Sequence, residues 1–252
     1  MKLVIIGGTG LIGSKLVTKL RERGHDAVAA SPDTGVNTLT GEGLAEALQD
    51  AAVVVDVSNS PSFEDAAVME FFTTSTRTLT QGARAAGVTH YVALSVVGTE
   101  RLSESGYFRA KAAQEQLIKN SSIPYSIVHA TQFFEFVKNI AAAATDGNTV
   151  RLAPVLIQPM AADEVAKAVG RIVVGTPVNG IVEVAGPEQF RLDEFILEGL
   201  KARQDRREVV ADPQSRYFGA MLSERTLVPA DNARLGEIRF QEWLGRPVLQ
   251  QR

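Results

Sequence analysis

Tyr107 and Lys111 offer the most direct acid–base chemistry in this sequence. They lie in the stretch SGYFRAK at residues 105–111, and side chains four positions apart share one face of a helix. A cation beside a phenol stabilises the phenolate, so we expect Lys111 to make Tyr107 easier to ionise. Such a pair can supply a proton to a carbonyl oxygen. The alternative is that Tyr107 is only an aromatic residue at the start of a helix.

The elements that must position this pair alternate between strands and helices. Apolar runs predict buried strands, and helical periodicity predicts the segments between them. The expected strands are 2–8, 26–31, 52–60, 90–98 and 124–130, and the expected helices are 11–24, 41–50, 63–87, 107–120 and 133–144. This alternation predicts an α/β fold with a doubly wound parallel sheet, a Rossmann fold.

The alternation loosens after about residue 150. A helix over 163–175, a strand over 180–188 and a helix over 192–203 follow, with loops in the tail. No Pro-, Gly- or Ser-rich linker separates two units. We therefore expect one domain over residues 1–252, in which residues from about 150 to 252 contribute a small C-terminal substrate lobe.

Composition narrows the classes of function. The chain has no cysteine, which excludes disulfides, thiolate metal sites and a thiol nucleophile. Its three histidines are far apart, so no metal site is expected, and its net charge of −3 without clustered basic residues argues against nucleic-acid binding. No apolar run is long enough to span a membrane, and the start does not look like a signal peptide. A soluble cytoplasmic protein is expected.

A glycine-rich turn joins the first strand to the first helix. In GGTGLIG, Gly7, Gly10 and Gly13 are spaced three apart. Glycines there allow a tight turn and let a pyrophosphate approach the free N–H groups of the helix. The position predicts a dinucleotide site; the alternative is a tight turn with only a structural role.

The end of the second strand bears on the choice of cofactor. NAD sites usually carry an Asp or Glu there, which binds the ribose 2′-hydroxyl. Here Ser31 occupies that position, and the first acid is Asp33. A hydroxyl accepts a 2′-phosphate that a carboxylate would repel, so NADP is favoured, with NAD still possible. Ser31 could otherwise be a simple loop cap before Pro32.

With these features the chain resembles the short-chain dehydrogenase/reductase superfamily, most closely its atypical branch with NmrA-like, NAD(P)H-binding members. The Gly-x-x-Gly-x-x-Gly spacing at 7–13 and VEVAGPEQFRLDE at 182–194 carry the likeness. In that family a Ser follows the fifth strand and Tyr-x-x-x-Lys opens the next helix, as Ser95, Tyr107 and Lys111 do here. The resemblance implies that Tyr107 exchanges the proton with the carbonyl oxygen, Ser95 hydrogen-bonds that oxygen, and Lys111 holds the nicotinamide ribose.

The resemblance also implies further contacts with the cofactor. The expected set, with the three glycines, is Thr9, Leu11, Ile12, Asn37, Ser58 and Asn59. One departure concerns the fourth helix, where the best-known branch carries an Asn that supports a proton relay. The corresponding stretch, 70–78, has no Asn, and a water held by Thr74 or Ser75 is the substitute that the sequence offers.

Aromatic residues beyond the strand ends suggest a substrate pocket. Phe133, Phe134 and Tyr217 would suit a small or aromatic carbonyl compound, although they could equally be core residues. His129 is expected to be a satisfied interior histidine and Asp56 a hydrogen-bonded structural acid.

Three functions remain open. The leading interpretation is an NADP-dependent oxidoreductase that reduces a small ketone, aldehyde or quinone-like carbonyl. The second is an NmrA-like nucleotide or redox sensor that regulates a protein partner without turnover. The third is an epimerase acting on a sugar nucleotide. A homodimer through the long helices is possible.

Overall fold

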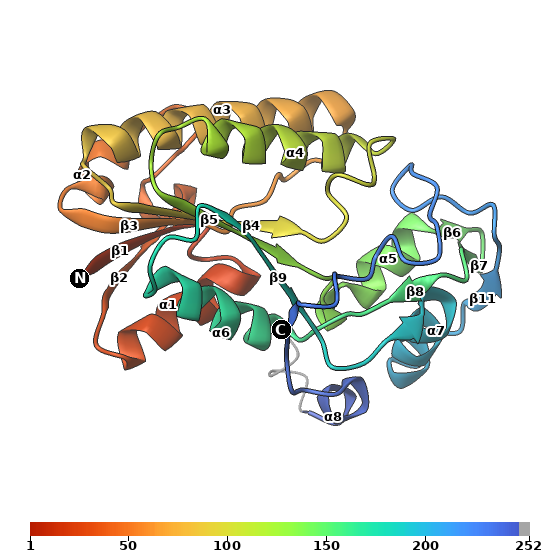
Figure 1. Ribbon diagram of the computed structural model, residues 1–252. Coiled ribbons are helices and arrows are strands. Elements are labelled where there is room, and N and C mark those ends of the chain that lie inside the picture. Colours follow the sequence, from red (N-terminus) through yellow and green to blue (C-terminus); the bar gives the residue numbers. More distant parts are fainter. Residues whose placement is uncertain (247–252) are drawn as a thin grey trace.

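Seven parallel strands form the central sheet. The computed structural model describes residues 1–246, and the strand order is β12-β9-β5-β4-β3-β1-β2, with every neighbouring pair parallel (Figure 1). The strands are β1 (Lys2–Ile6), β2 (Asp26–Ala30), β3 (Ala51–Asp56), β4 (His90–Val96), β5 (Tyr125–Ala130), β9 (Gly180–Ala185) and β12 (Arg234–Leu235). The predicted doubly wound α/β fold is confirmed.

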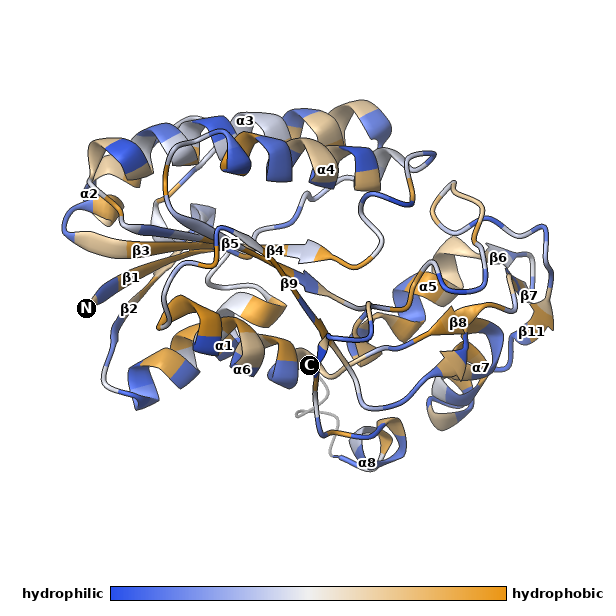
Figure 2. Cartoon of the chain, in the orientation of Figure 1, coloured by the Kyte–Doolittle hydropathy of each residue, from blue (hydrophilic) through white to orange (hydrophobic). Residues whose placement is uncertain are grey.

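Helices cover both faces of this sheet. On one face lie α1 (Leu11–Glu22) and α6 (Ala162–Val173), and on the other lie α3 (Asp65–Ala85) and α4 (Gly106–Lys119), with the short α2 (Leu44–Leu48) beside α3 (Figure 1). Figure 2 shows apolar residues along the strands and mixed faces on the helices. In α1, for example, Ile12, Leu16 and Leu20 are buried and recur at the helical period, as an amphipathic helix on a sheet requires.

A second group of elements lies beyond the carboxyl ends of the strands. A 3-10 turn (Phe134–Phe136) leads into α5 (Val137–Ala143), where the sequence predicted one continuous helix. The group also contains the strands β6 (Thr145–Asp146), β7 (Thr149–Leu152), β8 (Leu156–Ile157), β10 (Phe190–Arg191) and β11 (Glu208–Ala211), and the helices α7 (Leu192–Ala202) and α8 (Phe240–Leu244). Its apolar side chains form a cluster separate from those on the two faces of the sheet.

The order of the strands decides where a ligand can bind. The chain runs from β1 to its neighbour β2 on one side, and then crosses to β3 on the other side of β1. In such sheets ligands bind at the carboxyl ends of the strands where the order reverses. The glycine turn directly follows β1 and therefore lies at this point. Within residues 1–246, no helix is both long and apolar enough to cross a bilayer.

Candidate functional site

The glycine turn is built from close backbone contacts. Gly7 adopts a φ of +76°, and a Cβ added there would lie 2.8 Å from the Cα of Ser58. A Cβ on Gly13 would lie 2.1 Å from the carbonyl oxygen of Gly7. Both distances are far below van der Waals contact, so the turn tolerates only glycine at these two positions.

The first turn of α1 is open to an anion. Gly10 caps the helix, and no side chain bonds to the free N–H groups at its start. Such groups carry the positive end of the helix dipole and point at whatever binds there. Together with the glycine cradle, they fit the pyrophosphate of a dinucleotide, and the predicted contacts Thr9, Leu11 and Ile12 lie in this turn.

Ser31 and Asn37, predicted to lie toward the adenosine end, are already hydrogen-bonded within the protein. The hydroxyl of Thr9 donates to the hydroxyl of Ser31 over 3.2 Å, and the N–H of Ser31 donates to Thr34 Oγ1 over 2.9 Å in the following 3-10 turn (Pro32–Thr34). The side chain of Asn37 accepts a bond from the N–H of Leu39. Ser31 therefore serves as a loop cap and also lies within reach of the glycine turn.

Ser58 and Asn59 follow β3 at the same edge of the sheet. The hydroxyl of Ser58 donates to Asp56 over 2.6 Å, while Asn59 is exposed. Asp56 also accepts a bond from the amide of Gln114 over 2.9 Å. The buried Asp56 is thus the hydrogen-bonded acid that its place in the strand suggested, and it links β3 to α4.

Lys111 lies inside the protein between α4 and the sheet. It is 2% exposed, and its ammonium group donates to the carbonyl of Leu94 over 2.9 Å and to Gln114. The ammonium also lies 4.5 Å from the centre of the Phe72 ring. Burial lowers the pKa of Lys111 to about 8, although the carboxylates of Asp56 and Glu115 act in the opposite direction.

Ser95 is bonded to an acid that the sequence analysis missed. Its hydroxyl, 2% exposed, donates to Glu115 over 2.6 Å, and Nε2 of His129 lies 2.8 Å from the same carboxylate oxygen. Burial alone would raise the pKa of Glu115, but the bonds and charge of His129, together with Ser95 and Lys119, hold it below its usual value. Since a hydroxyl has one proton, Ser95 in this arrangement offers a ligand only its lone pairs.

The spacing of residues along the predicted helix could have identified Glu115 from the sequence. It follows Lys111 by four residues, as Lys111 follows Tyr107, so the three side chains share one face of α4. His129 lies in the adjacent strand, opposite Ser95 in the register of β4 and β5. The histidine is buried and paired, as expected of an interior histidine.

Tyr107 lies at the start of α4 among aromatic rings. Its ring centre is 5.6 Å from that of Phe63, 6.0 Å from Phe72 and 5.5 Å from Phe108. Burial raises the pKa of the phenol, which is opposite in sign to the effect that the sequence led us to expect from Lys111. Among the described residues, no hydrogen bond joins Tyr107 to Ser95 or Lys111, and its link to Lys111 is the shared contact with Phe72.

The three predicted substrate residues lie in different surroundings. Phe134 is 0% exposed and packs on Phe240 and Trp243, with ring centres 5.0 and 5.5 Å away. Phe133 stacks on Phe136 in the cluster beneath α6. Tyr217 is buried in the same core cluster as Phe134 and also packs against the partly exposed Phe218. The core alternative thus describes all three residues.

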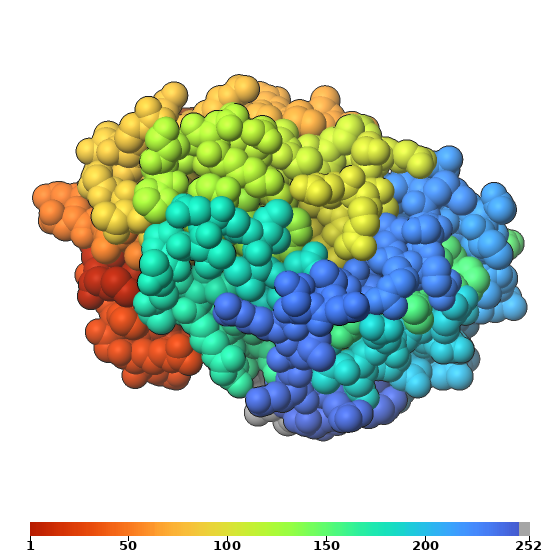
Figure 3. All heavy atoms as spheres, in the orientation of Figure 1, coloured from red at the N-terminus to blue at the C-terminus, as the bar shows by residue number. Residues whose placement is uncertain are grey.

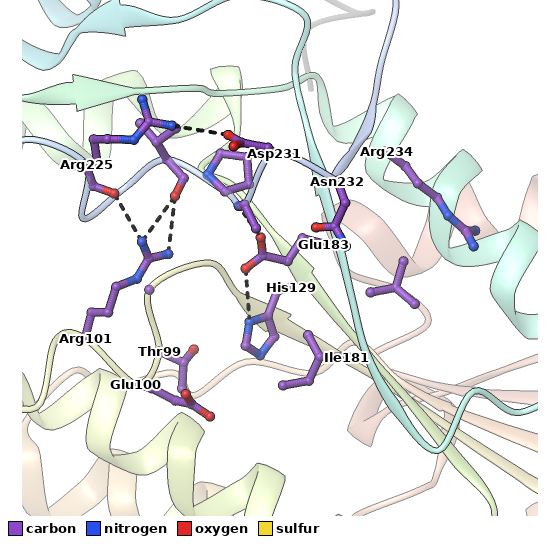
Figure 4. A pocket seen from close by; sticks show the side chains of 15 residues that line it. Thr99, Glu100, Arg101, His129, Ile181, Glu183, Arg225, Asp231, Asn232 and Arg234 are labelled. Carbon is purple, nitrogen blue, oxygen red and sulfur yellow. Dashed lines mark hydrogen bonds and ion pairs between the residues drawn. The ribbon is translucent and has the colours of Figure 1, made fainter.

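A hollow of about 760 Å³ opens over β5 and β9 (Figure 4). His129, Glu183 and Arg101 line it; Glu183 lies 4.0 Å from Nδ1 of His129, and Arg101 is bonded to the carbonyls of Arg225 and Val228. In Figure 3 the yellow atoms near residue 100 meet the blue atoms of the tail in this region. Its lining includes residues of β9 and excludes the glycine turn, so the hollow and the turn are separate features of the surface.

A family comparison agrees with this site. The profile of a family described as NAD(P)H-binding matches residues 7–173, from the glycine turn through α6. The chain belongs to this NAD(P)H-binding family. Photosystem II assembly factor Ycf39 of Cyanophora paradoxa is 25% identical over 165 residues, which are 60% of this chain and 51% of that protein. The chain thus spans about half the length of this curated relative.

Solved structures share the fold. A short-chain dehydrogenase/reductase superfamily protein from Agrobacterium tumefaciens, with bound NAD, is similar with a TM-score of 0.73 and 14% identity, over 97% of this chain and 95% of that chain. An NADPH-dependent quinone oxidoreductase from Escherichia coli is similar with a TM-score of 0.67 and 15% identity, over 96% and 98%. The predicted NAD(P)H-binding family is thus confirmed by the family profile, and these structures confirm the fold.

Proposed function

We propose that this protein is an NADP-dependent reductase of a small ketone, aldehyde or quinone-like carbonyl, with Tyr107 as the proton donor. The observation that carries the proposal is the position of Tyr107, at the start of α4 and at the carboxyl edge of a sheet whose glycine turn fits a dinucleotide. Family membership supports the cofactor class, and the fold shared with a quinone oxidoreductase agrees with the reaction class.

The chain's own residues divide the work in this proposal. Bound reduced nicotinamide supplies the hydride to the carbonyl carbon. The phenol of Tyr107, whose raised pKa keeps it protonated at neutral pH, donates its proton to the carbonyl oxygen. Lys111 holds a positive charge one helical turn away. Ser95 donates its proton to Glu115 and so supports α4 against β4; in this arrangement it has no proton for the carbonyl oxygen.

Ser31 supports NADP over NAD in this proposal. It presents a hydroxyl beside Thr9, where an acid would repel a 2′-phosphate. Titration with NADPH and NADH tests the preference, and tighter binding of NADH would overturn it.

The central test is Tyr107→Phe, with Tyr125→Phe as the matched control. Tyr125 is the first residue of β5 and therefore lies at the amino-terminal ends of the strands, away from the proposed site. Loss of a general acid typically lowers the rate about 100-fold or more, so oxidation of NADPH over a panel of carbonyl compounds should fall by that factor in Tyr107→Phe alone. Affinity for NADPH should not change. Full activity in Tyr107→Phe would contradict the proposed role.

A second candidate function is nucleotide sensing without turnover. Ser95 and Lys111 donate their hydrogen bonds to groups of the protein itself. In addition, a relative of the chain is named as an assembly factor. Tight NADPH binding with no turnover of any carbonyl, together with a protein partner whose affinity changes with the redox state of the nucleotide, would favour this function.

A further inference from the structure

Gln132 is a buried amide whose hydrogen-bonding groups are poorly satisfied. It follows β5 at the carboxyl edge of the sheet and is 6% exposed. Within residues 1–246, neither its nitrogen nor its oxygen makes a hydrogen bond of standard geometry, and the same holds for the hydroxyl of the adjacent Thr131. Burying an amide with poorly satisfied hydrogen-bonding groups costs free energy, so such a group calls for an explanation, and a bound ligand is one.

The neighbour of Gln132 belongs to the tail of the chain. The phenol of Tyr217 interacts with the Gln132 amide, without a hydrogen bond of standard geometry, and lies close enough to Tyr107 to be influenced by it electrostatically. Tyr217 begins a tight turn that Ala220 closes with two backbone hydrogen bonds of 2.8 and 3.1 Å. Gln132 is therefore close to residues of the late segment, and it is not part of the glycine turn that fits the dinucleotide.

The turn itself holds an aromatic ring in a strained position. Its central residues, Phe218 and Gly219, have φ values of +46° and +90°. Two-residue hairpin turns with both φ values positive favour Asn or Gly at the first position, and a bulky residue with positive φ is strained. Phe218 is nevertheless 37% exposed, so burial in the core does not explain why a phenylalanine occupies this position.

Phe218 completes a row of rings that ends at the proposed acid. Its ring centre lies 6.3 Å from that of Phe63, at an interplanar angle of 30°, and Phe63 lies 5.6 Å from Tyr107. Phe63 is 55% exposed. We call Phe63, Tyr107, Tyr217 and Phe218 the aromatic cluster; three separate segments of the chain contribute to it.

We propose that Gln132 recognises a second oxygen group on the substrate, while the aromatic cluster stacks on its ring. The substrate class is then a planar carbonyl compound with a second oxygen across the ring, such as a hydroxyketone or a quinone. This inference rests on the proposed reductase function. In the reaction, the carbonyl carbon gains a hydride from reduced nicotinamide, its oxygen gains the Tyr107 proton, and the second oxygen forms only a hydrogen bond with Gln132.

The test compares two ketones that differ only in this second oxygen. The probes are α-tetralone and its γ-hydroxy derivative, and the variants are Gln132→Met and, as a control on the exposed face of α4, Gln116→Met. Losing one hydrogen bond to the substrate should lower kcat/KM about tenfold. We expect that loss for the hydroxyketone with Gln132→Met, an unchanged value for α-tetralone, and unchanged affinity for NADPH.

Three results would overturn the inference. Equal activity of wild type and Gln132→Met on both ketones would show that the amide is not used. Weaker NADPH binding in the variant would assign Gln132 to the nicotinamide carboxamide. A marked drop in Tm would assign it a structural role, whereas removal of a buried amide whose groups are poorly satisfied should leave Tm nearly unchanged. If Gln132→Met does not fold, Tyr217→Phe replaces it in the same comparison of the two ketones.

Equilibrium binding separates this inference from the reductase proposal. The hydroxyketone is titrated by calorimetry into wild type and Gln132→Met, each saturated with NADP⁺. Binding by wild type that weakens in the variant, without turnover, would support the site and refute the reductase. Turnover that does not change in Gln132→Met would support the reductase and refute the Gln132 site. If the hydroxyketone does not bind at all, both proposals are refuted.

Discussion

The glycine turn and the inner face of α4 are both functional candidates, but they are constructed differently. The turn is made of backbone, and its shape depends on the absence of side chains at Gly7 and Gly13. The face of α4 is made of long side chains whose partners come from three strands. A backbone site can be recognised from a short local pattern, whereas a side-chain site depends on how a helix is rotated against a sheet.

The largest effect is expected at the turn. Gly13→Ala places a Cβ 2.1 Å from the carbonyl oxygen of Gly7, so the turn must open and NADPH binding should be lost. Gly170→Ala in α6 is the control, because a Cβ there meets only Leu16 at 3.4 Å. Fluorescence titration with NADPH measures both variants. Equal affinity in the two would mean that the dinucleotide does not bind at this turn.

A smaller effect, on stability, is expected from Glu115→Ala. The change leaves Ser95 and His129 buried without their acceptor, and breaking a buried pair costs about 3 kcal/mol. Urea unfolding measures it, with Glu70→Ala on the exposed side of α3 as the control.

The pH dependence of this loss has a definite sign. The pKa of Glu115 is lower in the folded than in the unfolded protein, so its stabilisation is complete above an unfolded value of about 4.3 and disappears as pH falls through the folded value. The difference between wild type and Glu115→Ala should therefore shrink in acid. A difference that is constant with pH would mean that the carboxylate charge has no role.

The smallest effect is the one expected from Lys111→Met. Burial lowers the pKa of Lys111 from 10.5 to about 8, so between these values the unfolded chain binds more protons. Stability of the wild type should then rise with pH, relative to the variant, by about 1 kcal/mol per unit. Urea unfolding at several pH values, with the exposed Lys201→Met as control, measures this. If the difference in stability between wild type and Lys111→Met does not change with pH, Lys111 is in contact with water in the folded protein.

The sequence was sufficient to predict the glycine turn and six strands of the central sheet, because these follow from local patterns. The tail was predicted as loops, and this was wrong for β12, a two-residue strand that pairs with β9. The sequence was not sufficient for the partners of Ser95 and Lys111. The bond from Gln114 to Asp56 joins residues 58 positions apart, and no local pattern encodes which α4 side chain meets which strand. Phe134 shows the same limit, since its burial depends on Trp243 from a helix near the end of the described chain.

Four hydrogen-bonded links hold α4 to the sheet. Gln114 joins it to β3 and Lys111 joins it to β4 at Leu94, while Glu115 joins it to β4 through Ser95 and to β5 through His129. The helix cannot slide or turn without breaking one of these buried bonds. The tyrosine at its start is therefore fixed relative to the sheet, whereas Phe63 and Phe218 belong to surface loops. For the proposed reductase, accommodation of substrates of different size would then come from these loops, with Tyr107 as the fixed reference point against which they adjust.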